Sequence, residues 1–382
     1  MSPHALRIRT AVVMGVGALA LATLSSCAYY NTFYLARKNY LIATGGLPYA
    51  VDKHASSTGA VVGTTASAVP QYNKAVDFSK KVLGLHPKSK WVDDAYLMWA
   101  RALIGKDDPT QALTLLKDFA LRYPESPLKT DAIFYRGVAL RHARKYLEAA
   151  ATLEEFAQAA PKHDLAPYAH LERARALIAL ERPAEAAEAA SVVLDRWPKH
   201  ALVDRALVTR ADARLAARDT ERARADYRAM GGRATTDNER FAYLLKEVDC
   251  LEAARDFAGA LGVLRDAISH EIEPARSDTA ARSVALPTGP GGVSAAERWG
   301  RLKMRIGTAH ALGGEAKPAL EAYEDVLAHY FRQPLGAEAQ YRIGYVYETV
   351  ADDFDRAREE YGKVRLQSPS SAFVAQAGEP RV

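Results

Sequence analysis

Alanine recurs along this chain at a fixed stride of 37 residues, and proline keeps the same stride through the first half. The alanines are Ala75, Ala112, Ala149, Ala186, Ala223 and Ala260, and the prolines are Pro87, Pro124, Pro161 and Pro198. A period between 20 and 50 residues is typical of arrays whose units are each too small to bury their own apolar face, so that they stack on their neighbours. The stride therefore predicts a stacked array of supersecondary units.

Each period carries the pattern of two helices joined by a short loop. In the unit that ends at Pro124, the loop 105–109 separates the two helical patterns. Spacings of three and four residues place Ala112, Leu116 and Phe119 on one face of the second helix. Proline then ends this helix, because it has no N–H group and its ring clashes with the preceding turn. We therefore expect each unit to be a helical hairpin.

Small residues recur twelve positions apart, one on each helix of a unit. Gly137 with Ala149 and Ala100 with Ala112 are two of these pairs. Without bulk at either position, two antiparallel helices can approach closely, and we expect larger residues such as Leu153 to fill the flanks.

This arrangement of small residue, alanine, large apolar residue and proline resembles the tetratricopeptide repeat. The resemblance implies an all-α fold, an α-solenoid of tetratricopeptide-like helical hairpins with a 37-residue period, against about 34 residues in the family. Seven complete units and a split first unit are expected. The repeats are placed at 71–272 and 299–377, and residues 273–298, which are rich in Gly and Pro, are expected to form a disordered insertion.

The N-terminus has the features of an export signal. Arg7 and Arg9 precede the uncharged apolar run 11–24, which is too short for a membrane span of about 20 residues. The following Leu24-Ser25-Ser26-Cys27 resembles a bacterial lipobox, which implies removal of residues 1–26 and lipidation of Cys27. Ala28 in place of aspartate favours the outer membrane. The alternative is an ordinary signal peptide that happens to contain a cysteine.

A dense aromatic stretch follows the lipid site. Residues 27–43 are predicted to hold the lipidated N-terminus and the first helix, and 44–70 a flexible loop before the partner helix. This entry segment resembles that of tetratricopeptide lipoproteins related to the outer-membrane assembly lipoprotein BamD. The stretch is either a simple tether or a set of aromatic residues that pack on the first unit and hold it against the bilayer.

Charge, cysteine content and motifs exclude several classes of function. The chain carries a net charge of +5, and without Arg7 and Arg9 the count is 49 minus 46, or +3, with no arginine-rich run, so nucleic-acid binding is not expected. No phosphate loop, paired Cys-x-x-Cys or catalytic motif occurs, so we expect neither an enzyme nor a cofactor nor a metal. The nearest candidate for a catalytic cluster is His163, His170 and Asp164, and its histidines are interpreted as ordinary surface or satisfied side chains. Cys250 is interpreted as a small buried hydrophobic residue.

The resemblance also implies a binding surface, because the first helices of tetratricopeptide hairpins line a concave groove. It places six charged residues toward that groove: Arg101, Arg141, Arg175, Arg205, Asp212 and Asp249. Basic early units and acidic later units would suit an extended peptide or a disordered segment of a partner.

The predicted function is therefore a lipid-anchored scaffold on the periplasmic face of the outer membrane. Its expected partners are proteins, either components of β-barrel assembly or unfolded outer-membrane protein segments. Two alternatives are a periplasmic repeat protein that coordinates envelope constriction with cell-wall synthesis and a non-catalytic regulator of cell-wall enzymes. The sequence does not indicate an oligomeric state.

Overall fold

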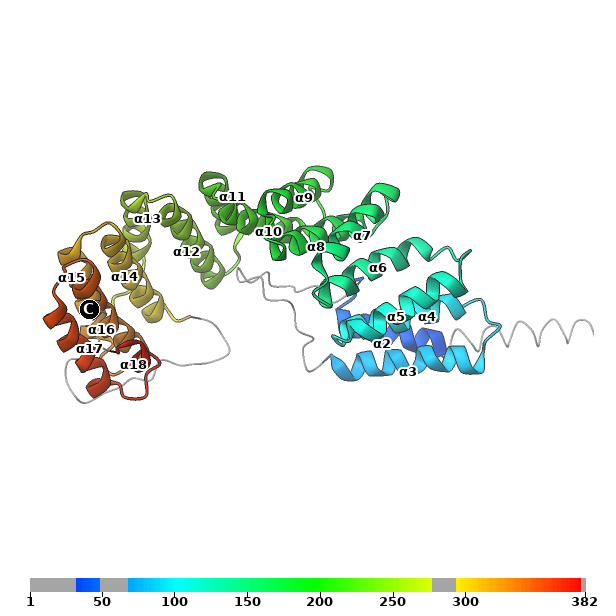
Figure 1. The fold of residues 1–382 in the computed structure, drawn as a ribbon, viewed down its shortest axis with the longest axis horizontal. Helices are drawn as coiled ribbons and strands as arrows, with labels where there is room; N and C mark the ends of the chain where they lie inside the picture. The colour runs from blue at the N-terminus through cyan, green and yellow to red at the C-terminus, as the bar shows by residue number, and fades with distance from the viewer. Residues whose placement is uncertain (1–31, 49–67, 277–292, 379–382) are drawn as a thin grey trace, which may run out of the picture. The chain divides into compact units, whose positions relative to one another are not determined.

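The structure, a computed structural model, describes residues 32–48, 68–276 and 293–378. These residues form helices joined by short turns, with no strand among them (Figure 1). They divide into two compact units, one ending at Ala213 and one beginning at Arg214, which are called here the N-terminal and C-terminal units. The predicted leader 1–26 and Cys27 lie outside the described residues, as do most of the two predicted loops.

The N-terminal unit is a series of antiparallel helical hairpins. Its first helices α4, α6, α8 and α10 begin at residues 92, 129, 166 and 203, and its second helices α5, α7 and α9 begin at 109, 146 and 183. Both series keep the 37-residue stride, so the predicted hairpins and their period are confirmed here. The helices are α2 (Tyr34–Thr44), α3 (Val69–Leu85), α4 (Val92–Gly105), α5 (Pro109–Arg122), α6 (Lys129–His142), α7 (Tyr146–Ala159), α8 (Ala166–Ala179), α9 (Pro183–Arg196) and α10 (Val203–Ala216), whose last turn belongs to the second unit.

The C-terminal unit continues the same architecture. Its hairpins are α12 with α13, α14 with α15, and α16 with α17, and a short helix follows the last of them. The helices are α11 (Thr220–Arg233), α12 (Asp237–Ala253), α13 (Phe257–Ser269), α14 (Ala295–Leu312), α15 (Ala316–His329), α16 (Pro334–Thr349), α17 (Phe354–Gln367) and α18 (Phe373–Gln376). The chain is thus an all-α solenoid of hairpins, as predicted.

The turn inside the hairpins repeats in its backbone conformation. Each of five turns holds a non-glycine residue at a φ between 57° and 63°, again 37 residues apart: Asp107, Arg144, Glu181, Arg218 and Arg255. Around Arg144, the Lys145 N–H donates to the Leu140 carbonyl at 2.9 Å, which is the six-residue bond of a Schellman cap. This left-handed conformation favours glycine, and Gly314 takes it between α14 and α15.

The turns between hairpins use serine and histidine in the same role. The Leu128 N–H donates to Ser126 Oγ at 3.1 Å. At the equivalent position two repeats further along the chain, the Leu202 N–H donates to His200 Nδ1 at 3.2 Å. At the intermediate position, His163 Nδ1 accepts the N–H of Leu165 at 3.2 Å. The histidines at these positions are therefore explained as caps that satisfy the first N–H groups of the next helix.

Large side chains of the second helices rest directly on glycines of the first helices. A Cβ atom added to Gly137 would lie 2.6 Å from Leu153 Cγ, and one added to Gly307 would lie 2.6 Å from a ring carbon of Tyr323. We expected Leu153 to fill the flank of the Gly137–Ala149 crossing, and it instead lies over Gly137. The glycine is needed because the opposite helix brings a whole side chain against its backbone.

Cys250 lies on α12 and is almost fully buried. Burial raises the pKa of its thiol to about 12, so the thiolate is disfavoured and the side chain packs as a small hydrophobic residue, in line with its interpretation from the sequence. None of the helices in the described ranges is long and apolar enough to cross a membrane.

Candidate functional site

Arg101 on α4, the first predicted groove residue, lies between two tyrosine rings and binds a main-chain carbonyl. Its guanidinium carbon is 4.5 Å from the ring centre of Tyr40 and 4.8 Å from that of Tyr135. Arg101 Nη2 donates to the carbonyl oxygen of Pro48 at 2.9 Å, and the hydroxyls of Tyr40 and Tyr135 donate to the same oxygen at 2.7 and 3.2 Å. Burial raises the pKa of both tyrosines, so the phenols stay protonated and can donate.

The Pro48 carbonyl is therefore held by side chains from three first helices, α2, α4 and α6. This is the surface on which the resemblance places the binding groove. A partner that used Arg101 would have to compete with this intramolecular carbonyl. The three-donor arrangement joins residues up to 87 positions apart in the chain, so no local sequence signal predicts it.

Arg141 on α6 and Arg175 on α8 share one buried carboxylate. Glu172 on α8 has no exposed surface, and it pairs with Arg141 Nε through one oxygen and with Arg175 Nη1 at 2.8 Å through the other. Two guanidinium groups on one carboxylate compensate for the burial of its charge. Glu172 was missed by the sequence analysis, although its position one turn before Arg175 is a signal for an ion pair within the helix.

The other three predicted groove residues have different surroundings. Arg205 on α10 is buried and Asp212 on the same helix is partly buried. Asp249 on α12 belongs to the C-terminal unit and accepts a hydrogen bond from Arg305 Nη2 of α14 at 2.8 Å. The structure thus brings Arg141 and Arg175 together, and it gives Arg101 and Asp249 separate intramolecular partners. Their role in a shared groove remains a prediction.

A cavity of about 510 Å³ lies in the C-terminal unit, between the first helices α14 and α16 and beside α18. Three tyrosines, one arginine, two threonines and one glutamine surround it, together with an apolar set from α14 and the end of α16. The lining residues are Thr308, Ala311, Leu312, Tyr323, Tyr341, Arg342, Tyr345, Thr349, Val350 and Gln376. We call this cavity the aromatic pocket.

The side chains of the aromatic pocket differ in how firmly they are held. Tyr323 OH and Thr308 Oγ1 lie 3.1 Å apart and hydrogen-bond to each other, and the Tyr341 ring stacks on Phe373 at 5.4 Å. Tyr345 is 44% exposed. Arg342 Nη2 is 3.5 Å from Glu338, and its buried Nε has no hydrogen-bond partner among the described residues. The pocket therefore combines hydrogen-bonded and stacked side chains with the exposed ring of Tyr345. Arg342 adds N–H groups that a ligand can accept from.

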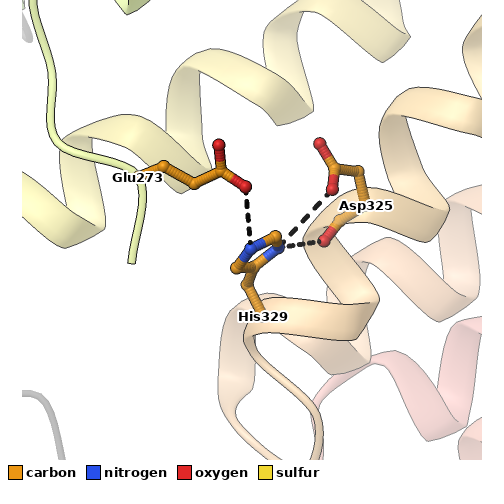
Figure 2. A group of neighbouring side chains, drawn as sticks. All are labelled: Glu273, Asp325 and His329. Carbon is orange, nitrogen blue, oxygen red and sulfur yellow. Dashed lines mark hydrogen bonds and ion pairs between the residues drawn. The ribbon is translucent and has the colours of Figure 1, made fainter. Parts of the chain in front are cut away.

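Glu273, Asp325 and His329 form a second cluster in the C-terminal unit, with ligand-type atoms within 4.8 Å of one another. Figure 2 shows the two carboxylates at different nitrogens of the His329 ring: Glu273 Oε1 is 3.2 Å from Nε2, and Asp325 Oδ1 is 3.6 Å from Nδ1. Asp325 also pairs with Lys303 Nζ at 2.7 Å. Lysine already supplies positive charge at Asp325, so the cluster is explained as an ion-pair network and we assign no metal to it.

His170 on α8 has a different environment from the capping histidines. Within the part of the chain that the structure describes, neither of its ring nitrogens has a hydrogen-bond partner, and the ring lies 5.9 Å from that of Trp197. Burial, together with Arg173 and Arg196, lowers the pKa of His170 to about 4. It is therefore a neutral, half-buried packing group, whereas His163 caps the turn before α8.

Comparison with known proteins identifies the repeats. The family model described as tetratricopeptide repeat matches residues 97–164, in the N-terminal unit, and 305–372, in the C-terminal unit. The chain therefore carries tetratricopeptide repeats in both units, and the second match contains most of the aromatic pocket. No curated protein matches the chain in sequence.

Several solved structures are similar to the chain at low identity. A tetratricopeptide repeat protein from Parabacteroides merdae shares 14% identity with a TM-score of 0.46, over 75% of this chain and 96% of its own. The apo form of RapI shares 13% identity with a TM-score of 0.44, over 75% and 80%. A chain of the Naa15/Naa10 assembly bound to HypK-THB shares 16% identity with a TM-score of 0.42, over 79% of this chain and 41% of that one.

Proposed function

We propose that this chain is a scaffold that binds an extended segment of a protein partner, and that the aromatic pocket is its principal docking point. Tetratricopeptide repeats support a role in protein–protein interaction. The observation that carries the proposal is the pocket itself, which lies between two neighbouring first helices and is lined by exposed Tyr345 and by Arg342.

The lining suits a polypeptide rather than a small polar metabolite. Tyrosine and arginine are the side chains that most often dominate the binding energy at protein interfaces, because they combine apolar area with a polar end. Leu312 is half exposed and offers apolar surface beside them. Arg342 can donate to a carboxylate or a main-chain carbonyl of the segment.

The finer proposal is that the scaffold is lipid-anchored through Cys27 on the periplasmic face of the outer membrane and serves outer-membrane protein assembly. The lipobox-like Leu24-Ser25-Ser26-Cys27 and Ala28 support the anchor, and the aromatic stretch after Cys27 supports the assembly role. The two alternatives are coordination of envelope constriction with cell-wall synthesis and regulation of cell-wall enzymes.

The pocket is tested by a pair of variants in the full chain. Tyr345→Ala combined with Arg342→Ala should abolish recovery of partners from detergent-solubilised membranes, while Arg358→Ala on α17, an exposed arginine outside the pocket, should leave recovery unchanged. Circular dichroism must show equal helicity in all three proteins. Equal recovery by the pocket variant and the control would refute the pocket as the docking point.

The identity of the recovered partner separates the finer proposals. A β-barrel insertase component in the co-purified material supports assembly of outer-membrane proteins, whereas a wall synthase supports one of the alternatives. The anchor is tested separately by Cys27→Ala, which should move the protein out of the membrane fraction. Retention in the outer-membrane fraction after a high-salt wash would refute lipidation as the main attachment.

A further inference from the structure

The outer face of α2 is apolar and basic, although α2 is the first described helix of the array. Its buried face consists of Ala36, Tyr40 and Thr44, which pack toward α3 and α4. Solvent-exposed faces of helices in soluble arrays are normally polar, and contiguous exposed apolar side chains mark interaction surfaces. The exposed composition of α2 therefore needs an explanation.

Five exposed residues make up this face: Tyr34, Arg37, Lys38, Leu41 and Ile42. At 100° per residue they lie within an arc of about 140° on one side of the helix. Ile42 is 57% exposed and Tyr34 is 43% exposed. This helix has no acidic residue, and its exposed face carries apolar and basic side chains together. On such a face the apolar groups can enter a membrane interface while the long basic side chains reach the headgroups.

We propose that this outer face of α2 rests on a phospholipid surface with anionic headgroups. Arg37 and Lys38 would face the headgroups, and Tyr34, Leu41 and Ile42 would enter the interface between headgroups and acyl chains. Of the two cations, Arg37 also interacts with Asp94 of α4, whose pKa is raised to about 6 by burial and Asp93. The charge of Arg37 is thus partly balanced within the protein.

The position of the face in the chain supports this occupant. Tyr34 follows Cys27 by seven residues. An extended residue spans at most about 3.6 Å, so a lipid on Cys27 lies within about 25 Å of the start of α2. In this respect the inference rests on the proposed lipid anchor, and it adds a second, protein-based contact that would fix the first unit against the bilayer. Lipid plus a basic patch is the combination that gives stable attachment.

The test places a fluorophore on α2 in the full chain reconstituted into vesicles of phosphatidylethanolamine and phosphatidylglycerol. An environment-sensitive label on Ile42→Cys is compared with the same label on Leu121→Cys of α5, which is 73% exposed. Brominated lipid should quench the label at 42 several-fold more than the label at 121. Equal quenching, or a label at 42 shielded from both lipid and aqueous quenchers, would overturn the proposal, the latter by showing a protein segment on this face.

Charge reversal supplies a second readout. Arg37→Glu with Lys38→Glu removes two cations and adds two anions, so the ratio of membrane-bound to free α2 should fall by roughly 30-fold or more. Quenching at position 42 should fall with it. The matched control, Lys117→Glu with Lys129→Glu, makes the same charge change at exposed positions of α5 and α6 and should have no effect. Replacing the anionic lipid with phosphatidylcholine should lower quenching of the wild-type helix in the same way. Quenching at position 42 that responds neither to charge reversal nor to the change of lipid would overturn the role of anionic headgroups.

Mass spectrometry of Cys27 tests the lipid anchor independently of the α2 contact. An unmodified Cys27 with strong quenching at position 42 would refute the anchor and keep the α2 contact. A modified Cys27 with no difference between positions 42 and 121 would keep the anchor and refute the α2 contact.

Discussion

The close contact between Gly137 and Leu153 predicts an unusual response to a mild substitution. Gly137→Ala adds one methyl group inside α6, which by helix propensity alone would stabilise the protein by about 1 kcal/mol. The added Cβ would lie 2.6 Å from Leu153 Cγ and 2.7 Å from Cδ2, so Leu153 or the helix must shift. Overpacking of this kind costs about 1 to 3 kcal/mol. The net expectation is a loss of about 0 to 2 kcal/mol.

The contact itself is isolated by a double-mutant cycle. Leu153→Ala alone should cost about 2 to 5 kcal/mol, because it leaves a cavity at a fully buried position. In that background the clash is gone, so Gly137→Ala should become stabilising by up to about 1 kcal/mol. The two changes together should therefore cost about 1 to 3 kcal/mol less than the sum of the single changes.

The matched control is Gly262→Ala on α13, where an added Cβ meets no atom of the described residues within 4 Å. It should stabilise the protein by up to about 1 kcal/mol in any background. Chemical denaturation followed by circular dichroism measures the free energies, and hydrogen exchange checks that protection is lost in α6 and α7 rather than throughout the array. If Gly137→Ala is as stabilising as Gly262→Ala, or if its effect is the same with and without Leu153, the packing argument fails.

Three further outcomes follow from the same structure. Arg144→Gly should stabilise the chain by about 0.5 kcal/mol in denaturation experiments, because relief of the left-handed conformation outweighs the entropy of glycine. Glu172→Gln should cost roughly 3 kcal/mol, since it leaves the guanidinium groups of Arg141 and Arg175 without their buried carboxylate; a neutral result in the same assay would contradict the shared ion pair. For His170, whose pKa is lowered from its ordinary 6.5 to about 4, the folded state prefers the neutral ring, so relative to His170→Phe the wild type should lose stability as pH falls from 6.5 to 4; parallel pH profiles of the melting temperature would refute this.

The 37-residue stride was sufficient to predict the repeat architecture, because small residues and prolines mark where each helix crosses and ends. It located the hairpins of the N-terminal unit closely, as α6 and α7 illustrate. It did not show that Leu153 lies over Gly137, since this depends on the rotation of each helix about its axis. Periodicity fixes the spacing of helices and leaves that rotation open.

The candidate sites were harder to predict than the fold. Arg101 lies on the first helix α4, but its partner Pro48 is 53 residues away in the chain, and no pattern links the two. Glu172 was not predicted, because the sequence does not distinguish a buried glutamate from an exposed one. The aromatic pocket arises where Tyr341 and Tyr345 of α16 meet residues of α14 and α18, and such a meeting of separate repeats has no local signature.

The central claim is that a protein partner docks in the aromatic pocket, and site-specific photocrosslinking in cells tests it most directly. A photoreactive phenylalanine derivative is introduced at Tyr345 in the pocket, and separately at Leu366 of α17, which is 84% exposed and lies outside the pocket. The proposal predicts a discrete protein adduct from position 345 and none from position 366. No adduct at 345, or equal adducts at both positions, would contradict it.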